Sequence, residues 1–312
     1  MTDDHDRTAS LMSPGKLSRL KPQPAATPEA WLDRMAADVG RLQVENLLEV
    51  QQALAQQALD RAAGALASDL QALAEAQQQL DFSLLQTRGW WARTTGKARS
   101  AGAEFAAQVE MISARVQSVT ARAGELSRNH GTGAATTDRS LLNLDVEYRA
   151  LDKIVEQGAK WLQDMRGQLQ QRHAAAAADP AAQQKVREDA ARCEILVARL
   201  KALRALSATA QQVLAQTRDL LAARGALVQH LSQALSATSR SWNARMGSLA
   251  QAAQAGADSP ELSVEAPQEI HRQMQHQVSQ AQADCARLAS LEEAAATVVA
   301  QMAGQIAAAR AA

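Results

Sequence analysis

The chain has 312 residues, and its 33 basic and 33 acidic side chains give a formal net charge of zero. This balance argues against nucleic acid as the partner, because binding to phosphates depends on clustered Lys and Arg. No run of about 18 apolar residues is present, so the sequence predicts no helix that spans a membrane.

Composition predicts an all-α protein. Apolar residues make up 46% of the chain, and most of them are alanine and leucine. Alanine and glutamine runs with few β-branched residues favour helix over sheet. Proline breaks helix interiors, and the seven prolines lie at positions 14, 22, 24, 28, 180, 260 and 267. The proline-free stretches 29–179 and 181–259 therefore predict long helices.

In chain order, the first element is a polar tail over residues 1–26, which we expect to be disordered. The pairs Thr27-Pro28, Asp179-Pro180 and Ser259-Pro260 each place a capping residue before a proline at the first helical position. Breaks are predicted at the glycine-containing stretches 86–97, 130–137 and 256–268. Five helices follow, over 28–86, 98–129, 137–178, 180–255 and 267–310. We expect one helical domain over 27–255, then a linker and a C-terminal helix over 256–312.

The fourth predicted helix carries a heptad stripe. Its first apolar row consists of Cys193, Leu200, Ser207, Leu214, Leu221, Val228, Leu235, Trp242 and Leu249. A second row, from Leu196 to Arg245, becomes polar toward its C-terminal half. This pattern is typical of coiled-coil packing, against other helices of the chain or in a parallel dimer. We expect the former, and so an elongated bundle of about five long antiparallel, coiled-coil-like helices.

The sequence carries no specific catalytic constellation. It has neither a phosphate-binding Gly-rich loop of the G-x-x-x-x-G-K-[ST] kind nor G-x-G-x-x-G. His271 and His276 are five residues apart, so on one helix their side chains diverge. Cys193 and Cys285 have no nearby partner cysteine, and we expect them to be reduced and structural. We therefore expect no enzyme, no cofactor and no metal site.

Two adjacent tryptophans stand out in an aromatic-poor chain. Trp90 and Trp91 lie in the basic segment LLQTRGWWARTTGKARS, with Arg93 and Lys97 close by. Three roles fit this segment. The rings could fill a hinge between helices, lie at the surface of an anionic membrane, or anchor a protein partner.

The same segment resembles the toxic anion resistance family, the TelA-like proteins associated with tellurite resistance. The linker of that family resembles residues 88–93 followed by Gly96-Lys97-Ala98. A later match resembles the tyrosine-containing helix of the family, in LNLDVEYRALDKIVEQGAKWL. In order, the resemblance covers roughly residues 40–250.

The most specific family motif resembles residues on the fourth predicted helix. Gln212 and Gln216 take its two glutamine positions, Arg218 its arginine and Trp242 its tryptophan. The motif has a proline where this chain has Ala215, and another before the tryptophan where this chain has the polar Arg240. The chain therefore resembles a divergent member of the family.

The resemblance implies a cytoplasmic, non-enzymatic helical scaffold linked to tellurite resistance and to the cell envelope or stress response. It implies an unidentified protein partner and allows peripheral contact with an anionic membrane. The alternative is a coiled-coil adaptor without a resistance role. The oligomeric state stays open. The candidate binding residues are Trp90, Trp91, Arg93, Lys97, Gln212, Gln216, Arg218 and Trp242.

Overall fold

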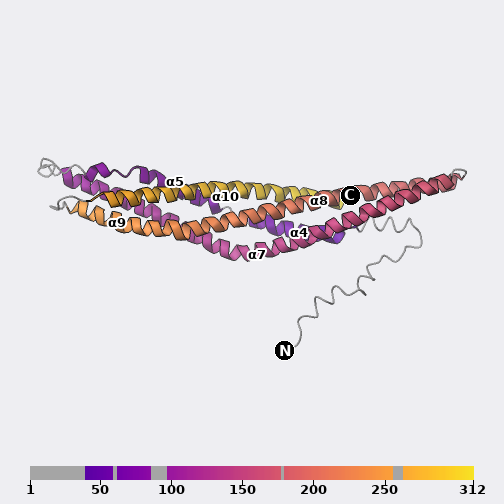
Figure 1. Cartoon of the computed structure of the whole chain (residues 1–312), viewed down its shortest axis with the longest axis horizontal. Helices are drawn as coiled ribbons and strands as arrows, with labels where there is room; N and C mark the ends of the chain where they lie inside the picture. Colours follow the sequence, from indigo (N-terminus) through magenta and orange to yellow (C-terminus); the bar gives the residue numbers. More distant parts are fainter. Residues whose placement is uncertain (1–38, 59–61, 86–96, 177–178, 256–262) are drawn as a thin grey trace, which may run out of the picture. The chain divides into compact units, whose positions relative to one another are not determined.

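A computed structural model describes residues 39–58, 62–85, 97–176, 179–255 and 263–312 (Figure 1). These residues form helices and short turns and contain no strand, which confirms the all-α prediction. The elements in chain order are α4 (Arg41–Ala58), α5 (Ala62–Gln78), η1 (Phe82–Leu85), α7 (Lys97–Ala175), α8 (Pro180–His230), η2 (Leu231–Leu235), α9 (Ser236–Gln254) and α10 (Glu265–Ala311).

The predicted helix start at Asp179-Pro180 is confirmed. Pro180 is the first residue of α8, and the Asp179 carboxylate accepts a 2.9 Å hydrogen bond from the Ala181 backbone N–H. α10 begins two residues before the predicted start, at Glu265, so that Pro267 lies in its first turn. The proposed start at Thr27-Pro28 and the Ser259-Pro260 pair lie outside the described residues.

The predicted single helix over 28–86 is wrong. Gly40 has a φ of 70°, a left-handed conformation that no α-helix contains, and α4 begins only after it. α5 ends at Gln78, and the next element is a short 3-10 helix. There the hydrogen bonds that Asp81 accepts from the side chain and from the backbone N–H of Ser83 lower the pKa of Asp81, and the backbone one fixes the turn.

The predicted break at residues 130–137 is also wrong, because α7 is continuous from Lys97 to Ala175. Glycine and threonine in this stretch have low helix propensity, but tertiary contacts hold it in the helix. Thr137 donates to the Gly133 carbonyl at 3.0 Å and to Gln57 Oε1 on α4 at 2.8 Å. Leu141 and Leu144, which follow on the same face, are buried.

Between α8 and α9 the helix widens into one π turn, η2. The Ser236 backbone N–H bonds to the Leu231 carbonyl, five residues back. A π turn rotates the following helix relative to the preceding one. Buried positions continue across the turn at Leu231, Leu235, Ser239, Trp242, Met246 and Leu249.

The chain forms two compact units. Unit 1 comprises the described parts of residues 1–48, 146–209 and 304–312, and unit 2 comprises 49–145 and 210–303. In unit 1, the end of α7 and the start of α8 form an antiparallel hairpin. Its two arms meet where Arg172 pairs with Asp189 and where Ser207 donates to the Tyr148 carbonyl. Its buried residues include Leu151, Leu162, Leu169, Leu196, Leu203 and Leu206.

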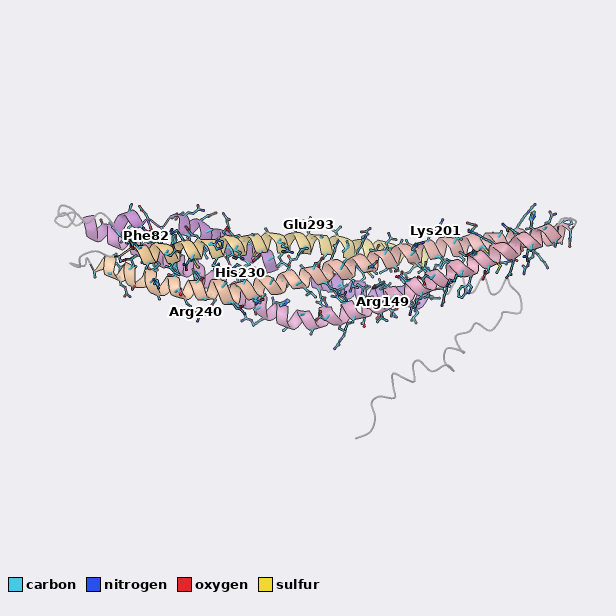
Figure 2. All side chains as sticks on the ribbon, in the orientation of Figure 1. Phe82, Arg149, Lys201, His230, Arg240 and Glu293 are labelled. Atoms are coloured by element: carbon cyan, nitrogen blue, oxygen red, sulfur yellow. The ribbon has the colours of Figure 1, made fainter. Side chains whose placement is uncertain are left out.

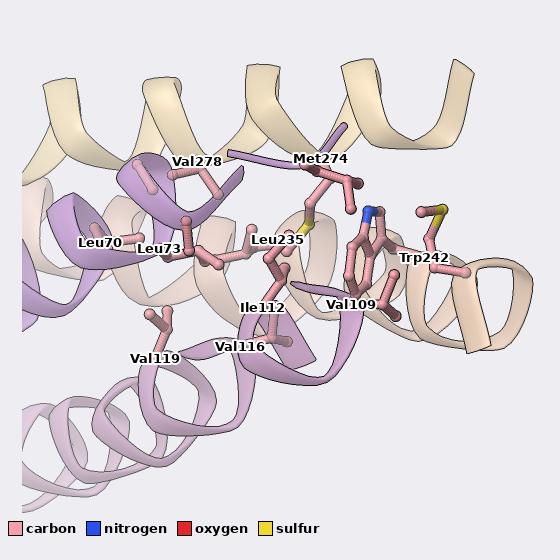
Figure 3. Packing of buried hydrophobic residues seen from close by; sticks show 14 of the residues in the cluster. Leu70, Leu73, Val109, Ile112, Val116, Val119, Leu235, Trp242, Met274 and Val278 are labelled. Atoms are coloured by element: carbon pink, nitrogen blue, oxygen red, sulfur yellow. The ribbon is translucent and has the colours of Figure 1, made fainter. Parts of the chain in front are cut away.

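Unit 2 has a continuous core to which α5, α7, α8, η2, α9 and α10 all contribute (Figure 3). Trp242 is fully buried there and is the largest fully buried side chain among the described residues. Close to it lie Val109 of α7 and Met274 of α10, both almost completely buried. The predicted C-terminal helix therefore helps to build this core rather than extending from it.

The heptad stripe of α8 and α9 packs within the chain. Its buried members are Cys193, Leu200, Ser207, Leu214, Leu235, Trp242 and Leu249. Leu221 and Val228 are only partly buried. Since these side chains are covered by other helices of the same chain, the expectation of intramolecular packing is confirmed.

Candidate functional site

An open groove lies between the two arms of the unit 1 hairpin. It has a volume of about 670 Å³. Its floor is apolar, and its rim is mostly basic. The floor residues are Val155, Ala159, Leu162, Val197 and Leu200, and the rim residues are Gln163, Arg166, Glu194, Lys201 and Arg204. We call this feature the hairpin groove.

Helical spacing explains how this groove combines an apolar floor with a charged rim. Lys201 and Arg204 follow Val197 by four and seven residues, so they lie on the same side of α8. Arg166 follows Leu162 by four residues and extends the same side of α7. Leu162 and Leu200 are buried, whereas Arg166, Lys201 and Arg204 are exposed; Lys201 is labelled on α8 in Figure 2.

Close approach of the two arms requires a small residue in α7. A Cβ added to Gly158 would lie 2.6 Å from Cδ2 of Leu200. Further along the hairpin, Asp189 is nearly buried and accepts from Arg172 Nη1 at 3.1 Å and from Arg192 Nη1 at 3.2 Å. These contacts set the register of the arms, and with it the geometry of the hairpin groove.

The described chain begins against α8, at residues that do not line the hairpin groove. Arg199, next to the floor residue Leu200, is 5% exposed and donates from Nε to the Val39 carbonyl at 3.2 Å. Burial, and then the nearby charge of Arg41, lower the pKa of Arg199 from its usual value. Gly40 follows in a left-handed turn, so close to Leu203 that an added Cβ would lie 2.8 Å from its Cδ1.

The four candidate residues on α8 and α9 do not form one site. Gln212 and Arg218 are exposed, whereas Trp242 is completely buried in unit 2. Gln216 is half-buried, and its Oε1 is enclosed without a hydrogen-bond partner. The structure thus separates the glutamine and arginine positions from the tryptophan.

Trp242 instead pairs with a histidine. Its Nε1–H donates to Nδ1 of His271 at 3.2 Å, and Nε2 of His271 lies 3.1 Å from the Gln77 carbonyl oxygen. Indole N–H can only donate and a carbonyl can only accept, so these contacts match neutral His271 with its proton on Nε2. Phe82 packs edge-on against the His271 ring, with 5.7 Å between the ring centroids.

Burial lowers the pKa of His271, and the hydrogen bond to the Gln77 backbone opposes this shift. A proton added to Nδ1 would point at the Trp242 N–H and break that hydrogen bond. The sequence singled out Trp242 and His271 separately. Their pairing could not be found from it, because 29 residues and a change of helix separate them.

The structure does not describe most of the tryptophan segment. Trp90, Trp91 and Arg93 lie outside the described residues, and Lys97 is described only as the first residue of α7. Cys193 and Cys285 are free and buried, and burial raises the pKa of both thiols, that of Cys285 to about 12.

Two kinds of feature are absent from the described residues. They hold no group of three or more His, Cys, Asp or Glu side chains arranged to bind a metal ion. None of their helices combines the length and the apolar character that crossing a bilayer requires. The hairpin groove was missed from the sequence, because its residues come from two segments about 40 positions apart.

Comparison with known proteins gave no relatives. No protein-family model matches the chain, no curated protein matches it, and no solved structure matches it. The resemblance to the toxic anion resistance family therefore stands on the motif residues alone.

Proposed function

We propose that the protein is a non-enzymatic helical scaffold that holds a partner protein in the hairpin groove. The observation that carries this proposal is the apolar floor between α7 and α8, bordered by Arg166, Lys201 and Arg204. An amphipathic helix docks in such a groove by its apolar face. The basic rim favours a helix with acidic residues beside that face.

The length of the hairpin groove suits a short helix. Its α8 side extends from Glu194 to Arg204, and ten residues of helix rise about 15 Å. The apolar floor supplies the affinity, because removing apolar surface from water is favourable. The charged rim selects the orientation and accelerates association more than it adds affinity.

For the cellular role, we propose resistance to tellurite and a part in the envelope or stress response, at the cytoplasmic side. This part of the proposal is supported by the resemblance at Gln212, Gln216, Arg218 and Trp242. The test is a gene deletion challenged with tellurite and with membrane-active agents. The deletion should raise sensitivity, and the wild-type gene should restore growth.

Complementation then tests the hairpin groove. A Lys201→Glu/Arg204→Glu gene should fail to restore growth, because its rim repels an acidic partner. Lys153→Glu is the matched control, since Lys153 is an exposed lysine of α7 that does not line the groove. Full complementation by the double variant would reject the hairpin groove as the working site.

The alternative is an adaptor that uses the same groove without any resistance role. It is favoured if the deletion leaves sensitivity to tellurite and to membrane-active agents unchanged.

Peripheral contact of Trp90 and Trp91 with anionic membranes stays a separate prediction. Co-sedimentation with anionic and neutral vesicles, using Trp90→Ala/Trp91→Ala as the comparison, tests it.

A further inference from the structure

We propose that Arg199, Arg41 and the first turn of α4 form a binding site for a small oxyanion of the phosphate class. The proposed site is separate from the hairpin groove. Arg199 faces away from the residues of α8 that line the groove, and Arg41 does not line it either. Both arginines belong to unit 1.

Arg199 is a nearly buried cation without a counter-charge. It is 5% exposed, and its Nε donates to the Val39 carbonyl at 3.2 Å. Among the described residues, no carboxylate forms an ion pair with it, and its two terminal nitrogens have no hydrogen-bond partner. Neither of these nitrogens is fully enclosed, so an ion can reach them. A buried charge without a counter-charge is costly, and an anion beside Arg199 removes that cost.

The nearest charge to Arg199 is positive instead of negative. After burial, the charge of Arg41 is the next cause that lowers the pKa of Arg199. Arg41 is exposed and forms no ion pair within the described part of the chain. Glu45, one turn further along α4, pairs with Arg310 at 3.3 Å rather than with Arg41. An anion between the two arginines would replace their repulsion by attraction to a shared partner.

The backbone adds donors to these two side chains. α4 begins at Arg41, and an α-helix leaves the N–H groups of its first turn without partners inside the helix. These groups point toward the end of α4 where Arg199 binds the Val39 carbonyl. The first turn has no acidic residue, and Gly40 before it has no side chain that could accept from them. The partial positive charge of a helix N-terminus favours an anion there.

Apolar side chains limit the size of the ligand. A Cβ added to Gly40 would lie 2.8 Å from Cδ1 of Leu203 and 3.3 Å from Cδ2 of Leu151. Both leucines are fully buried, and they keep water from one side of the site, which strengthens its charge interactions. A compact oxyanion can accept from guanidinium and backbone N–H groups together. Once bound, it ties the start of α4 to α8.

Equilibrium dialysis of the full-length chain with radiolabelled inorganic phosphate tests the site. The expected result is saturable binding of one phosphate per chain, which sulfate displaces and chloride at the same ionic strength does not. Arg41→Gln should weaken binding roughly tenfold, because a charge-assisted contact is lost. Arg41 is exposed, so this change should not disturb the packing. Arg199→Gln should weaken binding at least as much.

Arg187→Gln is the matched control, since Arg187 is an exposed arginine of α8 in the same unit. Its affinity for phosphate should equal that of the wild type. Circular dichroism and a thermal melt confirm that each variant is folded before affinities are compared. Competition by glycerol 3-phosphate distinguishes two sources of the oxyanion. Equal competition assigns the site to a phosphate ester, and weaker competition assigns it to the free ion; either result supports the proposal.

Three outcomes overturn the proposal. They are the absence of saturable binding, binding of several ions per chain, and equal affinities of Arg41→Gln and Arg187→Gln. The last two would show general attraction of anions to a surface rather than a built site. The proposed function is tested separately, because complementation by the Lys201→Glu/Arg204→Glu gene concerns the hairpin groove and involves neither Arg41 nor Arg199.

Discussion

The two units bury their apolar stripes in different ways. In unit 2, one continuous core that includes Trp242 and Phe105 draws residues from α5, η1, α7, α8, η2, α9 and α10. Unit 1 relies mainly on the two arms of a hairpin, with short contributions from α4 and the end of α10. Its contacts include polar ones, such as Asn46 to Glu147 and Arg310 to Glu45.

This difference explains where a binding surface can arise. A helix surrounded by several others has its apolar stripe covered on all sides, so little of that stripe remains for a partner. Two helices leave a groove on each side of their contact. In unit 1 one such groove has an apolar floor, whereas in unit 2 the apolar core residues are buried. Unit 2 thus provides stability, and unit 1 provides the candidate surface.

The sharpest test of this comparison is to truncate the tryptophan in each unit. Trp242→Ala should lower the free energy of unfolding by about 3–5 kcal/mol, because it leaves a large cavity and an unpaired His271. Trp161→Ala, on the partly buried face of α7 in unit 1, should cost about 1 kcal/mol. Urea denaturation followed by circular dichroism measures both. Equal losses would contradict a core concentrated in unit 2.

Glycine substitutions should give the next largest difference in stability between the two units. Gly40→Ala should destabilise by about 1–3 kcal/mol, since alanine is strained at a φ of 70° and its Cβ would press on Leu203. Gly131→Ala in unit 2 should instead stabilise by about 0.5–1 kcal/mol, because its Cβ meets open space within a continuous helix. Thermal melts measure the change in stability for both variants. Destabilisation by Gly131→Ala would argue against a continuous α7.

The lowered pKa of His271 predicts that the stability of unit 2 depends on pH. Its pKa is lowered in the fold, so between that pKa and about 6.5 the unfolded chain binds more protons. The contribution to stability is complete above about pH 6.5 and is lost as the pH falls toward the folded pKa. Urea titrations from pH 8 to pH 4 measure this loss.

His271→Leu is the control for that titration. It should cost about 1–3 kcal/mol at pH 8, because the Trp242 N–H and the Gln77 carbonyl lose their partner. It should also flatten the pH dependence near pH 6. An unchanged slope would show that other groups carry it.

The smallest expected difference between the units is in the reactivity of their buried thiols. Cys285 has a pKa of about 12 and is 1% exposed, so it should not react with a thiol reagent at pH 8 until the protein unfolds. Cys193 in unit 1, whose pKa is also raised, should react only slowly. Counting modified thiols over time, with and without urea, tests this. Rapid labelling of Cys285 would mean that the core of unit 2 opens frequently.

Composition, proline spacing and the heptad repeat were enough to predict the helical class, the buried face of α8 and the start of α8 at Pro180. Each depends on local chemistry that acts within a few residues. Alanine favours helix, a seven-residue repeat places side chains on one face, and Asp179 caps the helix that follows.

Tertiary contacts decided the continuity of α7, the Trp242–His271 pair and the hairpin groove. Residues 130–137 are helical because Thr137 and the leucines after it pack on other helices, which outweighs a weak local propensity. Trp242 meets His271 only because α10 packs against α9, and Arg166 lines one groove with Lys201 and Arg204 only because α8 returns along α7. Periodicity shows which face of a helix is buried, but it carries no information about which helix covers that face.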